Sequence, residues 1–150
     1  MKIYTDGACR GNGKETSRGA WAFVVVDENE EIIHQASEGI KNTTNNIMEI
    51  TAAIQALQWL STQEIIKTQS PTVASDSQYV IKGITEWIHG WKFKNWKATT
   101  GPVKNVELWK HLDILNANVK PMWMWVRGHD GNQFNEVADS LCNQALDKLK

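Results

Sequence analysis

The sequence predicts a single α/β domain in which a mixed β-sheet is flanked by helices. Three strand-like segments come first, because residues 2–6, 19–26 and 32–39 alternate apolar with polar residues or are rich in β-branched side chains. Two more, at 72–76 and 121–126, are separated by segments with a helical spacing of apolar residues. With 150 residues, of which 41% are hydrophobic, the chain can form one core without disulfides or a structural metal.

Helices are predicted where apolar residues recur every three to four positions. Thr44 precedes the first such segment as a suitable N-cap, and either Asp76 or Ser77 can cap the second. Between the first two strands, residues 7–18 contain three glycines and no apolar run, which predicts a loop. The predicted helices cover residues 44–60, about 77–87, 103–116 and 134–149.

Composition excludes several classes of protein. No stretch approaches the roughly 18 consecutive apolar residues of a membrane span, so we expect no contact with a membrane. Cys9 and Cys142 are too few for a disulfide framework and lack the spacing of a zinc finger. We therefore expect a reducing, cytoplasmic location.

The charge of the chain is unevenly distributed. A net charge of −1 by itself argues against a nucleic-acid-binding protein. However, residues 82–110 contain six lysines and two acids, so this segment carries +4 and the remainder −5. A basic segment on an acidic body predicts a polyanionic partner.

Four acids lie beside apolar segments. Asp6 and Asp76 each end a predicted strand, while Glu49 and Asp139 lie among apolar residues of two helices. If the two strands are neighbours, the four carboxylates can meet at one edge of the sheet, where hard cations such as Mg²⁺ would neutralise them. Two such ions, about 4 Å apart, would stabilise the attacking and leaving oxygens of a phosphodiester displacement. The alternative is that Asp6 and Asp76 cap turns or helices and that Asp139 is an exposed helical acid.

Five short segments carry a family resemblance: YTDGACRGN at 4–12, TNNIME at 44–49, SDSQYV at 75–80, WVRGH at 125–129 and NEVAD at 135–139. In residue type and order they resemble the motifs of type 1 ribonuclease H enzymes, and the resemblance extends from residue 3 to about residue 146. It implies a ribonuclease H-like fold with a five-stranded mixed sheet and helices on both faces. It also implies endonucleolytic hydrolysis of the RNA strand of RNA–DNA hybrids, with 5′-phosphate and 3′-hydroxyl products.

The resemblance also assigns catalytic roles. It implies that Asp6, Glu49, Asp76 and Asp139 bind two Mg²⁺ ions, for which Mn²⁺ could substitute. His129 matches a histidine that helps proton transfer or product departure, a role suited to a side chain that titrates near neutrality.

The same resemblance implies where the hybrid binds. Short amide side chains beside the minor groove would recognise the 2′-hydroxyl groups of RNA, and Thr44 would contact a DNA phosphate. Residues 87–104 resemble a basic handle that grips the DNA strand, although for Trp87 and Trp109 a core position is an equal alternative. Ile47 departs from the family pattern, since arginine often occupies its position near the phosphate. The expected substrate-binding residues are Cys9, Asn12, Thr44, Asn45, Asn46, Gln78, Trp87, Trp91, Lys92, Lys94, Trp96 and Lys97.

Three other functions compete with this expectation. A hybrid-binding module without catalysis would be favoured by a lost acid, but all four acids and His129 are present. A strand begins almost at Met1 and the chain ends soon after the last helix, so we expect a stand-alone enzyme rather than the nuclease domain of a reverse transcriptase. The resemblance to ribonuclease H implies a monomer. A resolvase or transposase of the same fold is disfavoured by the motifs at 44–46 and 76–78.

Overall fold

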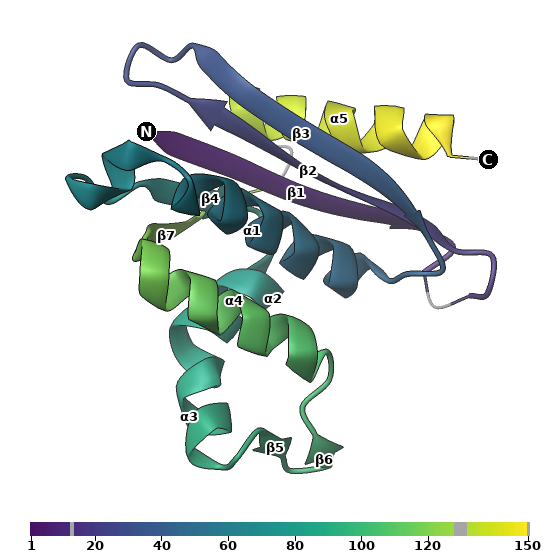
Figure 1. The fold of residues 1–150 in the computed structure, drawn as a ribbon. Coiled ribbons are helices and arrows are strands. Elements are labelled where there is room, and N and C mark those ends of the chain that lie inside the picture. The colour runs from purple at the N-terminus through teal and green to yellow at the C-terminus, as the bar shows by residue number, and fades with distance from the viewer. Residues whose placement is uncertain (13, 128–131, 150) are drawn as a thin grey trace.

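A five-stranded mixed sheet forms the centre of the molecule (Figure 1). The computed structural model describes residues 1–12, 14–127 and 132–149. Within this part the strand order is β3-β2-β1-β4-β7; β2 is antiparallel to both β1 and β3, whereas β1, β4 and β7 are parallel. The strands are β1 (Lys2–Arg10), β2 (Arg18–Val26), β3 (Ile32–Lys41), β4 (Thr72–Ser75) and β7 (Met122–Trp125), with a separate pair, β5 (Lys97–Ala98) and β6 (Gly101–Pro102).

Helices cover both faces of this sheet, so the predicted α/β fold is confirmed. On one face α1 lies against β1 and β2 and packs against α4, while α5 lies across the first three strands on the other face (Figure 1). Among the described helices, none has the length and apolar character needed to cross a membrane. The helical elements are α1 (Asn45–Ser61), a 3₁₀ turn η1 (Glu64–Lys67), α2 (Gln78–Lys82), a π-helical turn η2 (Gly83–Trp87), α3 (Ile88–Phe93), α4 (Val106–Val119) and α5 (Gln133–Lys148).

The two faces of the sheet bury different hydrophobic clusters. Phe23 and Val25 of β2 belong to the cluster beneath α1, whereas Val24 between them packs with Phe134 of α5. Because β2 is covered on both sides, almost all of its residues are buried, which explains why its sequence is an unbroken apolar run rather than an alternating one.

The first strand is longer than the sequence predicts. We expected it to end at Asp6 and residues 7–18 to form a loop, but β1 continues to Arg10. Its extension pairs with β2, whose first residue, Arg18, lies opposite Arg10. The glycines in this stretch suggested a loop, whereas hydrogen bonds to β2 hold it as a strand.

The segment after β4 projects from the sheet (Figure 1). The predicted second helix continues through α2, η2 and α3, so the expected handle begins inside a helix. Gly83 makes room for the buried ring of Trp109, because a Cβ at this position would clash with that ring. Trp109 is therefore a core residue, whereas Trp87 remains 41% exposed.

Candidate active site

Three carboxylates converge where β4 ends. One oxygen each from Asp6, Glu49 and Asp76 lies within 4.8 Å of the others. Asp6 and Glu49 are only 5% and 7% exposed, and Asp76 is partly exposed. Carboxylates that are so close and so poorly solvated repel one another strongly unless cations or protons neutralise them.

Parallel pairing of β1 with β4 places Asp6 beside Asp76. The last pair of this ladder is Thr5 with Ser75, so the two aspartates occupy the next position on neighbouring chains. Beyond this point β1 pairs only with β2, which opens the edge at which the carboxylates meet.

Gly7 allows α1 to approach β1 closely enough to bring Glu49 to the site. A Cβ atom on residue 7 would lie 2.5 Å from the backbone nitrogen of Glu49 and 2.6 Å from the backbone carbon of Met48. Any side chain there would therefore displace the helix. The backbone N–H of Gly7 also lowers the pKa of both Asp6 and Glu49, against the larger effect of burial.

Helix α5 contributes a fourth carboxylate. Asp139 is near enough to Asp6 to raise the pKa of that carboxyl, and its charge also acts on the buried thiol of Cys142. Cys142 lies beneath the site and donates to the backbone oxygen of Asp6 at 3.5 Å. The four acids that the sequence singled out thus lie together rather than serving as separate turn, cap and surface residues.

Burial and mutual repulsion raise the pKa of two of these carboxyls. The pKa of Asp6 rises from 3.8 to about 8, chiefly through burial and then through the charges of Asp76 and Asp139. Burial, followed by the charges of Asp6 and Asp76, raises the pKa of Glu49 well above its ordinary value. Without a counter-ion, the cluster therefore retains protons near neutral pH.

The donor set fits hard divalent cations. Oε2 of Glu49 is buried and has no hydrogen-bond partner among the described residues. An unpaired buried carboxylate oxygen is costly unless a cation approaches it, and carboxylate oxygens are the protein ligands that Mg²⁺ prefers. Asp6, Glu49 and Asp76, with Asp139 beside them, are therefore suited to bind such ions.

The predicted amide residues lie beside the start of α1. Thr44 caps the helix, as predicted, by accepting from the backbone N–H of Ile47 at 3.2 Å. Oδ1 of Asn12 accepts from the backbone N–H of Asn45 at 2.8 Å and so ties the first loop to α1. Thr44 and Ile47 also line a hollow of about 290 Å³, together with Lys14, Glu15, Ser17, Asn42 and Thr43.

The remaining predicted residues near the carboxylates differ in exposure. Asn46 and Gln78 lie in the first turns of α1 and α2, and both are exposed. Cys9 is partly buried, and its thiol lies 3.5 Å from the backbone oxygen of Thr43, consistent with the expected packing role. His129 lies outside the described residues.

The handle tryptophans divide between core and surface. Trp91 and Trp96 are partly buried and pack against the main core, where Trp91 meets Trp109 at a centroid distance of 5.3 Å. The exposed Trp87 ring lies 6.0 Å from that of Trp91. Beside it is a hollow of about 300 Å³, lined by Trp87, Gly90, Trp91, Lys94, Lys97, Ala98 and Thr99.

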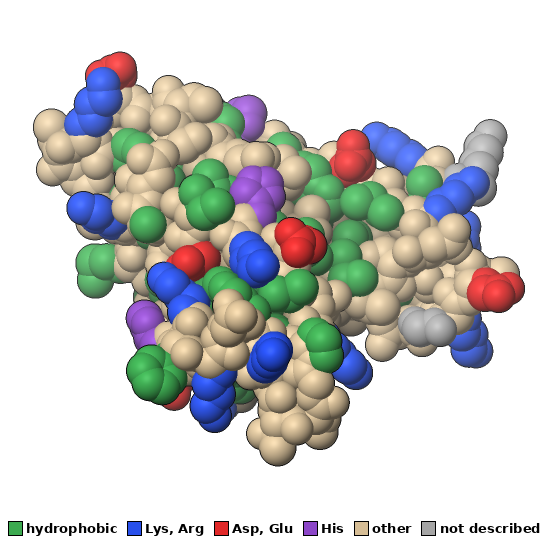
Figure 2. Space-filling view, turned by 60° about the horizontal axis from the view of Figure 1, so that its bottom comes forward, with side chains coloured by type: hydrophobic (Ala, Val, Ile, Leu, Met, Phe, Trp, Pro, Cys, Tyr) green, Lys and Arg blue, Asp and Glu red, His purple; other side chains and the backbone are tan. Residues whose placement is uncertain are grey.

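The handle lysines are not equivalent. Lys92 forms a 3.1 Å ion pair with Asp113 of α4, so part of its charge is neutralised within the protein. In the part of the chain that the structure describes, neither Lys94 nor Lys97 forms an ion pair, and both line the hollow. Phe93, between the first two lysines, is 92% exposed. Figure 2, in which this end of the molecule faces forward, shows Lys and Arg side chains interspersed with hydrophobic ones.

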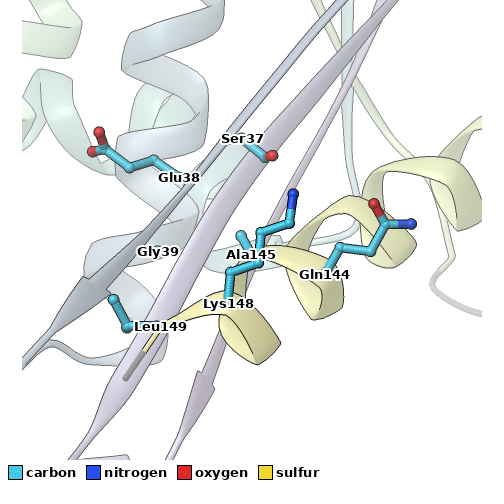
Figure 3. A pocket seen from close by; sticks show the side chains of 7 residues that line it. All are labelled: Ser37, Glu38, Gly39, Gln144, Ala145, Lys148 and Leu149. Carbon is cyan, nitrogen blue, oxygen red and sulfur yellow. The ribbon is translucent and has the colours of Figure 1, made fainter.

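A separate pocket of about 240 Å³ lies between β3 and the end of α5 (Figure 3). Gly39 permits the close approach of the helix, since a Cβ there would lie 2.9 Å from the backbone oxygen of Ala145. The lining of this pocket includes none of the four acids, and β3 is separated from β1, which carries Asp6, by β2. The lining residues, none of which the sequence predicted as functional, are Ser37, Glu38, Gly39, Gln144, Ala145, Lys148 and Leu149.

Two contributors to the site were given no role by the sequence analysis. Gly7 could have been noticed, because a glycine directly after a candidate metal ligand often marks a close backbone approach. Trp125 donates its indole N–H to the backbone oxygen of Asp76 at 3.2 Å. No sequence signal indicates that contact, because its acceptor is a main-chain atom 49 positions away.

Comparison with known proteins gives matches along nearly the whole chain. A family profile described as RNase H matches residues 1–147. The ribonuclease H of Treponema denticola is 44% identical over 161 residues, covering 99% of this chain and 98% of that protein. The ribonuclease H of Janthinobacterium sp. (strain Marseille) is 49% identical over 149 residues, with 98% and 96% covered. The crystal structure of LC11-RNase H1 in complex with RNA/DNA hybrid superimposes with a TM-score of 0.75 at 25% identity, covering 98% of this chain and 96% of that one.

Proposed function

Because this chain belongs to the ribonuclease H family, we propose that it hydrolyses the RNA strand of RNA–DNA hybrids as a metal-dependent endonuclease. The observation that carries the proposal is the convergence of Asp6, Glu49 and Asp76 within 4.8 Å, with Glu49 Oε2 buried and unpartnered among the described residues. The complex of LC11-RNase H1 with an RNA/DNA hybrid supports the substrate class.

The carboxylates would hold two divalent cations, Mg²⁺ or Mn²⁺ in its place. When bound, such ions supply activation of the attacking water and stabilisation of the departing 3′ oxygen, which gives 5′-phosphate and 3′-hydroxyl ends. The positive charge of these ions would be held against the scissile phosphate by the four acids Asp6, Glu49, Asp76 and Asp139. Because Asp6 and Glu49 are poorly solvated, the electrostatic interactions of their carboxylates are stronger than they would be in water. His129 would transfer a proton or assist departure of the product.

Substrate recognition would use two surfaces. Beside the carboxylates, Thr44 would meet a DNA phosphate, and short side chains would face the minor groove of the hybrid and recognise the 2′-hydroxyl groups. The minor-groove residues are Cys9, Asn12, Asn45, Asn46 and Gln78. At the handle, stacking and phosphate neutralisation would hold the DNA strand. The handle residues are Trp87, Trp91, Lys92, Lys94, Trp96 and Lys97.

We propose that residues 1–150 form one ribonuclease H domain, with the handle at about 87–104. We also propose that it acts as a monomer in the cytoplasm. Support for this location comes from Cys9 and Cys142, which are both free thiols, as expected in a reducing compartment.

The test is cleavage of an end-labelled RNA–DNA hybrid, alongside duplex RNA, single-stranded RNA and duplex DNA, in Mg²⁺ or EDTA. Asp76→Asn removes the charge of one metal ligand, whereas Asp27→Asn makes the same change in an exposed turn far from the site. We expect Mg²⁺-dependent cleavage of the hybrid's RNA strand alone, which Asp76→Asn abolishes and Asp27→Asn preserves. Tight hybrid binding without cleavage would instead indicate a binding module, and cleavage of duplex DNA a resolvase-like enzyme.

A further inference from the structure

The corner between β4 and α2 carries Asp76 and is held on both sides of that residue. The backbone N–H of Val126 donates to the oxygen of Ser75 at 2.9 Å. The N–H of Ser77 donates to Oγ of Ser75 at 3.0 Å, and Ser77 itself caps α2. None of these bonds involves the carbonyl group of Asp76.

Trp125 supplies a hydrogen bond to that carbonyl. It is the last residue of β7 and pairs in register with Ser75. Its Nε1–H donates to the backbone oxygen of Asp76 at 3.2 Å, and the side chain remains 41% exposed. A tryptophan with so much of its surface in solvent contributes less to the core than a buried one, so the directed N–H bond is the distinctive feature of this residue.

We propose that Trp125 is a positioning residue for the metal site, because its indole N–H orients the Asp76 peptide and thereby the direction in which the Asp76 carboxylate meets the cations. This inference rests on the proposed metal-dependent function. If the indole N–H is removed, water can satisfy the carbonyl at this partly exposed corner, so the fold keeps most of its stability while the peptide gains freedom to rotate.

The expected effect is on metal affinity. Removal of groups that orient metal ligands commonly lowers metal affinity by about 10- to 100-fold. Because Trp125 acts on the backbone rather than on the carboxylate itself, we expect a smaller loss, of about 3- to 10-fold.

Trp123 offers a matched control on the same strand. Its Nε1–H donates to Oδ1 of Asn116 in α4 at 2.8 Å, rather than to a residue of the carboxylate cluster. Trp123→Phe and Trp125→Phe therefore each remove one indole hydrogen bond from β7, but only the second removes a bond to a metal-ligand residue.

In the first experiment, Mg²⁺ alone is titrated into each protein without nucleic acid, and its binding is followed by NMR of the protein. In the second, the Mg²⁺ concentration that gives half-maximal hybrid cleavage is measured. We expect Trp125→Phe to require about 3- to 10-fold more Mg²⁺ in both experiments and to regain most of its kcat at saturating Mg²⁺. Trp123→Phe should match the unmodified protein. An unchanged Mg²⁺ affinity in Trp125→Phe, or an equal loss in Trp123→Phe, would overturn the inference. Failure of the unmodified protein to bind Mg²⁺ would instead refute the metal-dependent function on which it rests.

A second replacement covers the outcome in which Trp125→Phe does not fold. Benzothienylalanine at position 125 keeps the bicyclic ring and exchanges only the N–H group for sulfur. The inference requires the same weakening of Mg²⁺ binding in this protein, and wild-type affinity would contradict it.

Discussion

Gly7 and Glu49 are in direct contact where α1 crosses β1, and the absent side chain of Gly7 sets how closely the two elements approach. A Cβ on residue 7 would lie 2.5 Å from the Glu49 backbone nitrogen, far inside van der Waals contact. The position of Glu49, a member of the carboxylate cluster, thus depends on a strand residue that has no side chain.

Gly7→Ala should therefore impair both stability and catalysis. We expect a loss of about 1–3 kcal/mol in the free energy of unfolding, because the helix backbone must move. The rate of hybrid cleavage should fall by about 100-fold, as expected when a catalytic group moves by roughly 1 Å. Urea unfolding and a cleavage assay measure the two effects. Gly90→Ala is the stability control, since a Cβ at Gly90 meets nothing within 4 Å. Full activity in Gly7→Ala would show that the contact does not position Glu49.

The raised pKa of Asp6 predicts a pH dependence of stability in EDTA. Its folded-state pKa of about 8 exceeds the ordinary 3.8, so the folded protein binds more protons than the unfolded chain between these values. Stability should therefore fall as pH rises from about 4 to about 8 and change little from this cause above pH 8. Asp6→Asn should flatten that slope, whereas Glu28→Gln in the exposed β2–β3 turn should not. Chemical unfolding at several pH values measures the slope of stability against pH. Equal slopes in the two variants would contradict the prediction.

Lys94 and Lys97 should contribute more to substrate binding than Lys92, because Asp113 already pairs with Lys92. Changing Lys94 and Lys97 together to Gln should raise KM several-fold with a smaller effect on kcat. It should also reduce the slope of log affinity against log salt by about 2, since each lysine that neutralises a phosphate adds about 1 to this slope. Lys92→Gln should change the slope less. Hybrid binding measured across a salt series compares the slope of the double variant with that of Lys92→Gln. A slope unaffected by the double change would show that Lys94 and Lys97 do not bind phosphate.

Asn12→Asp separates the structural and binding roles of Asn12. The carboxylate retains an oxygen that can accept from the backbone N–H of Asn45, so thermal stability should stay close to that of the unmodified protein. The lost amide donor and the added negative charge should raise KM for the hybrid by about 10-fold, since one decade corresponds to roughly 1.4 kcal/mol. Asn12→Ala should lower stability as well, because it removes the acceptor. An unchanged KM in Asn12→Asp would place Asn12 outside the substrate interface.

Local sequence features were sufficient where a residue acts on its near neighbours. Thr44 and Ser77 cap their helices through bonds that span three positions, and such patterns are visible in a linear sequence. The order of strands and helices likewise follows from apolar spacing. The four acids could be selected because they stand beside apolar residues and within recognisable motifs.

Other features depend on partners that are distant in sequence, and local patterns could not predict them. β1 continues past Asp6 only because β2 begins at Arg18 and supplies hydrogen bonds to the added residues. Trp87 and Trp109 are chemically identical, but only Trp109 lies over Gly83 in the core. Lys92 has a partner in α4 that Lys94 and Lys97 lack among the described residues.

The sequence by itself thus determined the order of the main strands and helices and which four carboxylates are the candidates for the site, since these depend on residue type and short-range spacing. Only the tertiary structure decided how those carboxylates are held. The close approach at Gly7 and the Trp125 bond to the Asp76 backbone join residues more than 40 positions apart. Such contacts arise when the sheet and helices pack, because steric fit and main-chain hydrogen bonds depend on where the backbone lies and leave no mark in local residue patterns.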